Sequence, residues 1–368
     1  MRRNTRWTVC SAVAVLVGLM TARPGLAADD ISDAKISEAV SDQLLYDEAT
    51  PSHLVDVSTL DGVVTLTGSV DNVLAKRRAT DVAEAVKGVR SVVNRITVNP
   101  IYRTDAQIKD DVVAALVADP AADSYELDVQ VDDGTVHLTG TVESWQEKRT
   151  AELVALGVMG VKEVDNDAAI KYRKKRSDFE IEKDVEARLK YDTILDDRML
   201  DVDVRNGEVK LSGSVGSAAE RRRAEQDSWV AGVSSVDSDG VDIRWWARDD
   251  MTRSGKYVHR TDKEIEDAVE DALFMDPRVF SFDVSANAVR GTVTLTGVVD
   301  NLAAKEAAEQ DARYTLGVYS VNNRIRVRPE ALPDNKVLAN RVRDAISRDP
   351  YVNRFDVSVT AINGKVYL

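Results

Sequence analysis

The sequence predicts an α+β fold, a tandem repeat of small modules that each run in the order α-β-β-α-β. Three series of glycines, which keep the same phase over four copies, predict this repeat. The first series recurs at intervals of 72, 73, 84 and 73 residues, and its members are Gly62, Gly134, Gly207, Gly291 and Gly364. The second series lies six positions beyond the first four of these, at Gly68, Gly140, Gly213 and Gly297. The third series begins a Gly-Val-x-x-Val motif, at Gly88, Gly160, Gly232 and Gly317.

The first element of each copy is predicted to be an amphipathic helix. A Ser or Thr stands four positions before its first apolar residue, where a hydroxyl accepts hydrogen bonds from free helix amides. These residues are Ser32, Thr104, Ser177 and Thr261. Apolar residues then follow at i, i+4 and i+8, as in Ile36, Val40 and Leu44. This spacing places them on one stripe that faces a core.

Two strands joined by a tight turn are predicted next. The first strand carries an Asp-Val pair, Asp56-Val57 in the first copy, and the second strand ends at the second glycine. The dipeptide between them is Asp-Gly or Asn-Gly in every copy except the fourth, which has Arg-Gly. Asp-Gly and Asn-Gly favour a two-residue hairpin turn.

An alanine-rich helix and a third strand complete the predicted module. In the first copy we expect the helix over residues 75–86 and the third strand over residues 92–98. Two helices then cover one face of a three-stranded sheet. The third copy is one residue shorter between its second and third glycines, which aligns Asp227 with alanines of the other copies. We therefore expect weaker packing in that copy.

The units resemble BON domains, the module of osmotically inducible periplasmic proteins. The residues that carry the resemblance are the hairpin glycine, the strand-ending glycine and the Gly-Val-x-x-Val motif, as in Gly62, Gly68 and residues 88–92. The resemblance covers nearly all of the chain after residue 28. It implies an αββαβ fold, a cell-envelope location and attachment to phospholipid membranes, and it implies no catalytic residue. Since one module has a small core, we expect neighbouring modules to stabilise one another.

The first 28 residues are predicted to be a cleavable secretory signal, which implies a periplasmic location. Basic residues begin the segment, residues 9–20 are apolar, and small residues precede Asp29. The alternative, an N-terminal membrane anchor, is disfavoured because spanning a bilayer takes about 20 apolar residues. Cleavage removes four arginines and no acid, which changes the formal charge from −14 to 45 − 63 = −18. It also removes Cys10, the only cysteine, so no disulfide is expected.

No residue pattern in the sequence is typical of an enzyme. His53, His137 and His259 occupy unrelated places in the repeat, so we expect no shared metal site. Carboxylate pairs such as Asp110-Asp111 do not have calcium-loop spacing and indicate a solvated acidic surface. We predict a protein that is not an enzyme and has no cofactor. Its acidic charge also argues against nucleic acid as a partner.

Two segments between modules combine basic and aromatic side chains. The first segment contains Lys171, Tyr172, Arg173, Lys174 and Lys175. The second segment contains Arg244, Trp245, Trp246, Arg248 and Tyr257. This mix favours contact with lipid headgroups or with a protein partner. The alternative is that the aromatic side chains pack in seams between modules while the charges are solvated.

The predicted organisation is a signal peptide followed by complete and incomplete modules. We assign residues 1–28 to the signal, 31–99, 103–171, 176–243 and 260–328 to modules one to four, 244–259 to a basic aromatic linker, and 332–368 to a truncated module five. In module five Asp334 is expected to cap the helix and residues 355–357 to form the first strand. Since the second helix and third strand are missing, we expect either a fragment of a longer protein or a module that does not fold alone.

The predicted function is non-enzymatic binding to a phospholipid membrane or to proteins of the cell envelope. The alternative is a chaperone-like role in the periplasm under osmotic stress.

Overall fold

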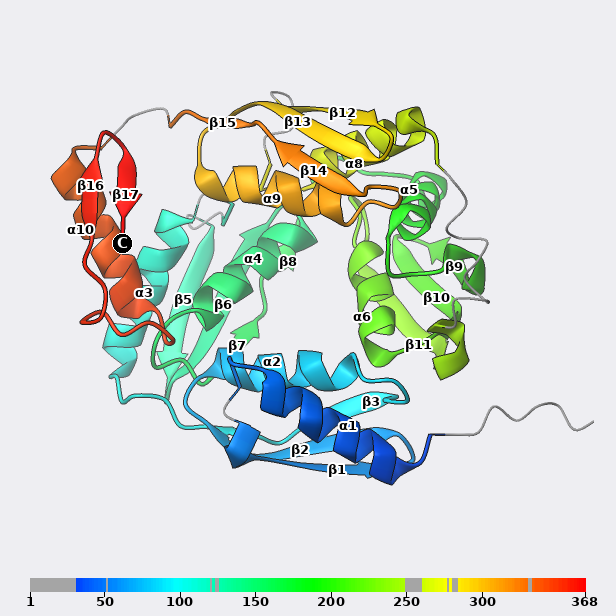
Figure 1. Ribbon diagram of the computed structural model, residues 1–368, viewed down its shortest axis with the longest axis horizontal. Coiled ribbons are helices and arrows are strands. Elements are labelled where there is room, and N and C mark those ends of the chain that lie inside the picture. The colour runs from blue at the N-terminus through cyan, green and yellow to red at the C-terminus, as the bar shows by residue number, and fades with distance from the viewer. Residues whose placement is uncertain are drawn as a thin grey trace, which may run out of the picture. The chain divides into compact units, whose positions relative to one another are not determined.

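The computed structural model describes residues 31–50, 52–119, 121–122, 126–248, 260–276, 278–279, 284–329 and 333–368. The predicted signal peptide lies outside these residues, and so does Tyr257. Within them, the predicted αββαβ order recurs in modules one to four, which confirms the fold class (Figure 1). None of the described helices has the length and apolar character that crossing a membrane requires.

Module one shows the common architecture. Its elements are α1 (Asp33–Tyr46), η1 (Ser52–Leu54), β1 (Val55–Leu60), β2 (Val63–Val70), α2 (Val73–Glu84), β3 (Ser91–Asn94) and β4 (Thr97–Val98). Strand β2 lies in the middle of the sheet, antiparallel to β1 and parallel to β3 and β4. Helices α1 and α2 contact each other and the sheet, so both lie on the same face (Figure 1).

The predicted third strand is interrupted in module one because an asparagine side chain bonds to the backbone. The Asn94 carboxamide accepts from the Ile96 N–H at 2.9 Å and donates to the Lys76 carbonyl at 2.7 Å. This turn divides the strand into β3 and β4 and brings Ile96 into the core, where it is 1% exposed. Asn166 and Asn323 make the same contacts in modules two and four.

The other modules repeat these elements. Module two has α3 (Asp105–Ala118), β5 (Leu127–Asp132), β6 (Thr135–Val142), α4 (Trp145–Leu156), β7 (Glu163–Asn166) and β8 (Ala169–Ile170). Module three has α5 (Asp178–Tyr191), η2 (Asp197–Met199), β9 (Leu200–Arg205), β10 (Glu208–Val215), α6 (Ala218–Asp227) and β11 (Ser235–Ile243), followed by η3 (Trp245–Arg248). Module four has α8 (Asp262–Met275), β12 (Val284–Val289), β13 (Thr292–Val299), α9 (Leu302–Arg313), β14 (Ser320–Asn323) and β15 (Arg326–Val327).

The first helices begin and pack largely as predicted. Thr104, Ser177 and Thr261 each cap their helix, and a Gln or Glu three residues later completes a capping box. Ser32 occupies the same position, but the prediction of a hydroxyl cap was wrong there, since its side chain makes no capping hydrogen bond. The apolar stripe is buried in all four helices, as Val40 at 0% exposure illustrates.

The two hairpin glycine series have distinct structural causes. Asp61 and Gly62 both have positive φ, 51° and 74°, which is the backbone of a type I′ turn. Gly68 has a φ of 120°, and a Cβ there would lie 2.0 Å from the Leu54 carbonyl oxygen. Gly68 was predicted to end its strand, but β2 continues to Val70, and Gly68 instead ends the pairing with β1.

The predicted alignment of Asp227 with alanine was wrong. The second helices carry two fully buried small residues four positions apart, Ala79 and Ala83 in α2 and Ala224 and Ser228 at α6. Ser228 therefore takes the position of the second alanine. Module three is one residue shorter than the others, and this residue is lacking after the helix and not within it. Asp227 lies one position before Ser228, and its carboxyl group neighbours Asp192, as described in the next section.

Module five differs from its prediction in one strand. It contains α10 (Asn335–Arg348), β16 (Thr360–Ile362) and β17 (Lys365–Tyr367). Asp334 caps α10 as predicted, since its carboxylate accepts from the Lys336 N–H at 2.8 Å. Residues 355–357 form no strand because the Asn353 side chain and carbonyl accept from the N–H groups of Phe355 and Asp356. Phe355 is consequently 80% exposed.

Candidate functional site

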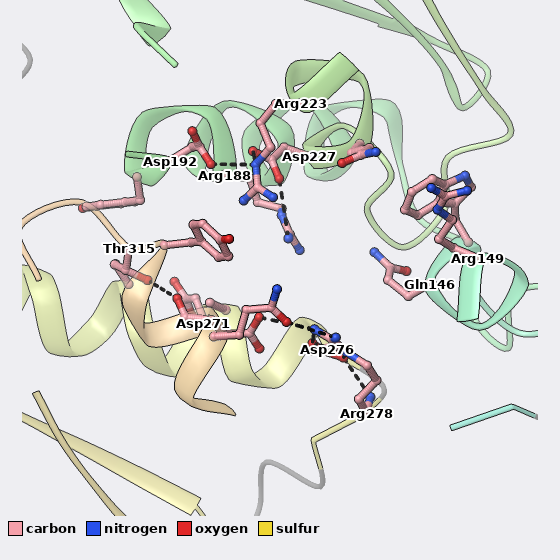
Figure 2. A pocket seen from close by; sticks show the side chains of 18 of the residues that line it. Gln146, Arg149, Arg188, Asp192, Arg223, Asp227, Asp271, Asp276, Arg278 and Thr315 are labelled. Atoms are coloured by element: carbon pink, nitrogen blue, oxygen red, sulfur yellow. Dashed lines mark hydrogen bonds and ion pairs between the residues drawn. The ribbon is translucent and has the colours of Figure 1, made fainter. Parts of the chain in front are cut away.

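Modules two, three and four border a cavity of about 370 Å³, which the sequence analysis did not predict. Its walls come from α4, α5, α6, α8 and α9 and from the residues that follow α5, α8 and α9 (Figure 2). We call it the carboxyl cavity, because five aspartates and four arginines line it: Asp192, Asp227, Asp271, Asp276, Asp311, Arg149, Arg188, Arg223 and Arg278.

Two of these aspartates belong to a fourth repeated series, which ends the first helix of every module. Asp192 follows α5, and its carboxylate accepts from the N–H groups of Ile194 and Leu195 at 2.7 and 2.9 Å. The series consists of Asp47, Asp119, Asp192, Asp276 and Asp349, and each member accepts from the loop that follows it. The sequence carries the signal for this series, an aspartate fifteen residues after each N-cap, but the series was not among the predictions.

A second carboxyl group lies beside this cap in modules three and four. Asp227 on α6 neighbours Asp192, and Asp311 on α9 neighbours Asp276. The pKa of Asp227 is raised to about 7, mainly because burial disfavours the charged carboxylate; Arg223 lowers it and Asp192 raises it. Burial also raises the pKa of Asp311 well above its ordinary range, although the side chain keeps 18% exposure.

Arginines partly neutralise both carboxyl pairs (Figure 2). The Arg223 Nε atom lies 2.8 Å from an Asp192 oxygen and 3.3 Å from an Asp227 oxygen. In module four the Arg278 Nε atom donates to Asp276 at 2.9 Å, and the guanidinium lies 3.8 Å from Asp311. Modules three and four thus each place two neighbouring carboxyl groups around one guanidinium. Such a pair of carboxyl groups binds a proton more readily than an isolated aspartate does.

The carboxyl cavity lies at a joint between modules. The Leu316 N–H of module four donates to the Tyr191 carbonyl of module three at 2.7 Å, beside a backbone bridge between Asp192 and Thr315. The Arg223 guanidinium also lies 5.2 Å from the centre of the Tyr314 ring. The aspartates and arginines of the carboxyl cavity are therefore part of the contact that joins modules three and four.

Modules two and three meet at another side of the carboxyl cavity. The Trp145 and Trp229 rings stack with centroids 5.8 Å apart and planes 10° apart. The Gln146 side chain donates to the Trp229 carbonyl at 2.8 Å. Within the described ranges, no three His, Cys, Asp or Glu side chains come close enough together to hold a metal ion.

The first predicted contact segment is divided between a seam and the surface. The Tyr172 hydroxyl donates to the Val233 carbonyl of module three at 2.8 Å, and burial raises the pKa of Tyr172 to about 12. Arg173 pairs with Glu143. Lys171, Lys174 and Lys175 are exposed, and we call these three side chains the lysine patch.

The second predicted contact segment also contributes to a seam. Trp245 is half-buried, with the Lys87 ammonium of module one 4.2 Å from its ring centre. Arg248 lies 3.2 Å from Glu220 and donates to the Ala85 carbonyl at 3.0 Å. Arg244 pairs with Asp242 at 3.1 Å. Trp246 keeps 40% exposure and is the described aromatic side chain of this segment that is most open to a partner.

These repeated units define a class, proteins made of tandem αββαβ modules, and sequence comparison identifies the family. The BON domain model matches residues 32–100, 104–172, 177–244 and 261–329. The chain belongs to the BON domain family, which confirms the resemblance carried by the glycine series.

Two relatives share part of the repeat. The chain is 33% identical over 148 residues to osmotically-inducible protein Y of Escherichia coli (strain K12), a match that covers 38% of this chain and 74% of that protein. It is 30% identical over 152 residues to an uncharacterized protein in the gshII 5' region of Anaplasma centrale, covering 40% of this chain and 99% of that one.

Similarity to solved structures is weak. The C-terminal domain of CdsD, the structural protein of the type III secretion system of Chlamydia trachomatis, is 14% identical with a TM-score of 0.17. The match covers 62% of this chain and all of that one. A similarity at this level carries no argument about the present protein.

Proposed function

We propose that this chain is a non-enzymatic binding protein of the bacterial cell envelope that attaches to phospholipid membranes during osmotic stress. Its relation to osmotically-inducible protein Y supports the envelope and osmotic-stress part. The observation that carries the membrane part is the lysine patch, three exposed lysines within five residues of a chain whose formal charge is −14. A local basic surface binds anionic headgroups even when the rest of the protein repels them.

The proposed membrane contact is smaller than the sequence analysis predicted. Tyr172, Trp245 and Arg248 contact neighbouring modules, so the alternative that aromatic side chains pack in seams accounts for part of both segments. The lysine patch and Trp246 face outward, and so do Arg173 and Arg244, whose guanidinium groups pair with Glu143 and Asp242. Lysines supply the charge attraction, and a tryptophan at the headgroup level adds an interfacial anchor.

The test of this function is vesicle binding by a charge-neutral patch variant. Lys171→Gln, Lys174→Gln and Lys175→Gln together should lower affinity for vesicles rich in phosphatidylglycerol by on the order of 100-fold. The matched control replaces exposed lysines on the first helices of modules one to three, Lys35→Gln, Lys109→Gln and Lys183→Gln, and should bind nearly as the parent does. Equal loss in both triple variants, or no binding by the parent chain, would contradict the proposal.

The same binding assay separates the alternative function. A chaperone-like protein would suppress aggregation of an unfolding envelope protein without binding vesicles, and the patch variant would retain that activity. This outcome would favour the chaperone-like role over membrane attachment.

Export to the periplasm is the second part of the proposal. It follows from the basic, apolar and small-residue pattern of residues 1–28, which lie outside the described residues. Mass spectrometry of the exported protein should find an N-terminus at Ala28 or Asp29. Recovery of the protein with Met1 intact would refute cleavage.

A further inference from the structure

One contact between modules occurs twice in this chain, at equivalent positions. The Leu316 N–H donates to the Tyr191 carbonyl, and the Met159 N–H donates to the Arg348 carbonyl, both at 2.7 Å. Leu316 and Met159 each precede the glycine of a Gly-Val motif. Tyr191 and Arg348 are each the last residue of a first helix. In each contact one module contributes the loop around the residue before its Gly-Val motif, which we call the donor loop. The other module contributes the last residue of its first helix, which we call the acceptor end.

Donor loops and acceptor ends that make this contact are less exposed than the equivalent loops and helix ends that do not. The donor residue Leu316 is 5% exposed and Met159 is half-buried, whereas the equivalent residues Lys87 and Ala231 are exposed. The Lys87 loop is covered by η3, because its side chain lies over Trp245 and the neighbouring Ala85 carbonyl accepts from Arg248. The donor loop of module three also has a neighbour, because the Val233 carbonyl accepts from the Tyr172 hydroxyl of module two, but Ala231 itself is exposed.

The acceptor ends follow the same pattern. Tyr191 and Arg348 are half-buried, whereas the equivalent residues Tyr46 of module one and Ala118 of module two are exposed, Tyr46 at 80%. Leu45 and Leu54, near the end of α1, are 66% and 47% exposed, so an apolar surface surrounds this acceptor end. Within the described residues, neither the Tyr46 carbonyl nor the Ala231 N–H bonds to another module.

We propose that the acceptor end of module one binds the donor loop of module three from a second copy of this chain. The partner is a second copy because each chain carries both halves and already uses this contact twice internally. Two copies related by a twofold axis can make the contact reciprocally, Tyr46 to Ala231 and Ala231 to Tyr46. Apolar surface and backbone hydrogen bonds hold the two copies together, while their like charges oppose association, so salt should strengthen the dimer.

Disulfide trapping between copies tests this inference, which does not depend on the proposed function. Cys10→Ser removes the only natural cysteine, and Tyr46→Cys and Ala231→Cys are then introduced in separate chains and mixed. Oxidation should give a covalent dimer roughly tenfold faster than a mixture of Leu60→Cys and Ala231→Cys, since docking raises the local thiol concentration. Leu60 is 73% exposed and lies away from the acceptor end, in β1.

The internal contact supplies the matched positive control. Tyr191→Cys with Leu316→Cys in one chain should form an intrachain disulfide, because these residues adjoin the antiparallel bridge between Asp192 and Thr315 and share a backbone hydrogen bond. Residues paired in this way have Cα atoms about 5.5 Å apart, which a disulfide can span. The proposal would be overturned if the intrachain disulfide forms but the covalent dimer forms no faster than in the Leu60 control. Failure of the internal disulfide would also overturn it, since the contact would then be absent in solution. A third overturning result is that vesicles protect the thiol of the Tyr46→Cys variant from maleimide without any dimer, which would assign the acceptor end to lipid.

Discussion

At the residue scale, the repeat is specified by residues that a particular backbone contact requires. Gly68 is required by a carbonyl that lies where its Cβ would be, and Asp192 is required by two amides of the loop that it caps. The glycines were predictable because they recur at fixed intervals. The pairing of Asp192 with Asp227 was not, because it depends on the three-dimensional meeting of α5 and α6.

Gly68→Ala tests the hairpin at this scale. The substitution places a Cβ 2.0 Å from the Leu54 oxygen at a φ of 120°, so we expect the free energy of unfolding to fall by about 3 kcal/mol or more. Gly157→Ala is the matched control, because its nearest neighbour would be 3.4 Å away and its φ is negative. Chemical denaturation of both variants measures the difference. Similar stability in the two would contradict the role given to Gly68.

Asp227→Asn tests the carboxyl cavity. The folded-state pKa of Asp227, about 7, is raised above its ordinary value, so the native state retains a proton that the unfolded chain loses. This contribution is fully present below about pH 4 and disappears as pH rises through about 7. The facing groups are Arg223, Arg188 and Asp192, and the variant keeps all three.

The Asp227→Asn variant should therefore show a flatter decline in stability between pH 4 and 7 than the parent and should be more stable at pH 8. Thermal unfolding across this range provides the measurement. Asp56→Asn, at an exposed position, is the control and should retain the parent profile. A decline in the Asp227 variant as steep as that of the parent would remove this aspartate from the pH dependence.

At the element scale, the helices and hairpins were predicted, and two of the errors in the strands occurred where asparagine side chains bond to the backbone. The hydrophobic spacing predicted the buried stripes of the helices, because a helix that packs on a core needs an apolar residue on the same face at every turn. It did not show that Asn94 divides a strand or that a turn at Asn353 replaces one, since both depend on local carboxamide bonds. Composition identified the two basic and aromatic segments, but composition does not distinguish a seam from an exposed surface.

The two tryptophans of the linker are expected to act differently. Trp245→Ala removes the ring beneath Lys87 and should loosen the seam between module one and the residues after module three. Trp246→Ala removes a 40% exposed side chain and should lower vesicle affinity without changing the thermal midpoint. Thermal unfolding and vesicle co-sedimentation of each single variant separate these effects. Unchanged vesicle binding by a folded Trp246→Ala protein would exclude this side chain from the membrane contact.

Module five should be the least protected of the modules. Within its described residues only Ala339, Val359 and Ala361 are buried among the apolar side chains, and its hairpin strands have three residues each. Amide exchange should therefore be faster along α10 than along α8, whose stripe is fully packed. Equal protection of α10 and α8 would show that the bond between Arg348 and Met159 stabilises module five as well as a complete core does.

At the scale of the whole molecule, the chain combines an acidic surface with a small basic patch and with contacts that recur between modules. The proposed membrane binding through the lysine patch and the proposed self-association through the acceptor end should respond to salt in opposite directions. The first is an attraction between opposite charges, which salt weakens, whereas the second is opposed by repulsion between like charges, which salt also weakens. The two activities can therefore be separated in one series of solutions.

The most direct test of the central claim is co-sedimentation of the chain lacking residues 1–28 with phosphatidylglycerol vesicles across ionic strengths from about 0.02 to 0.5 M. We expect binding at low salt that weakens progressively as the salt concentration rises, and no binding to vesicles of neutral phosphatidylcholine at any salt concentration. Binding that is independent of salt, or equal for anionic and neutral vesicles, would contradict attachment through the lysine patch.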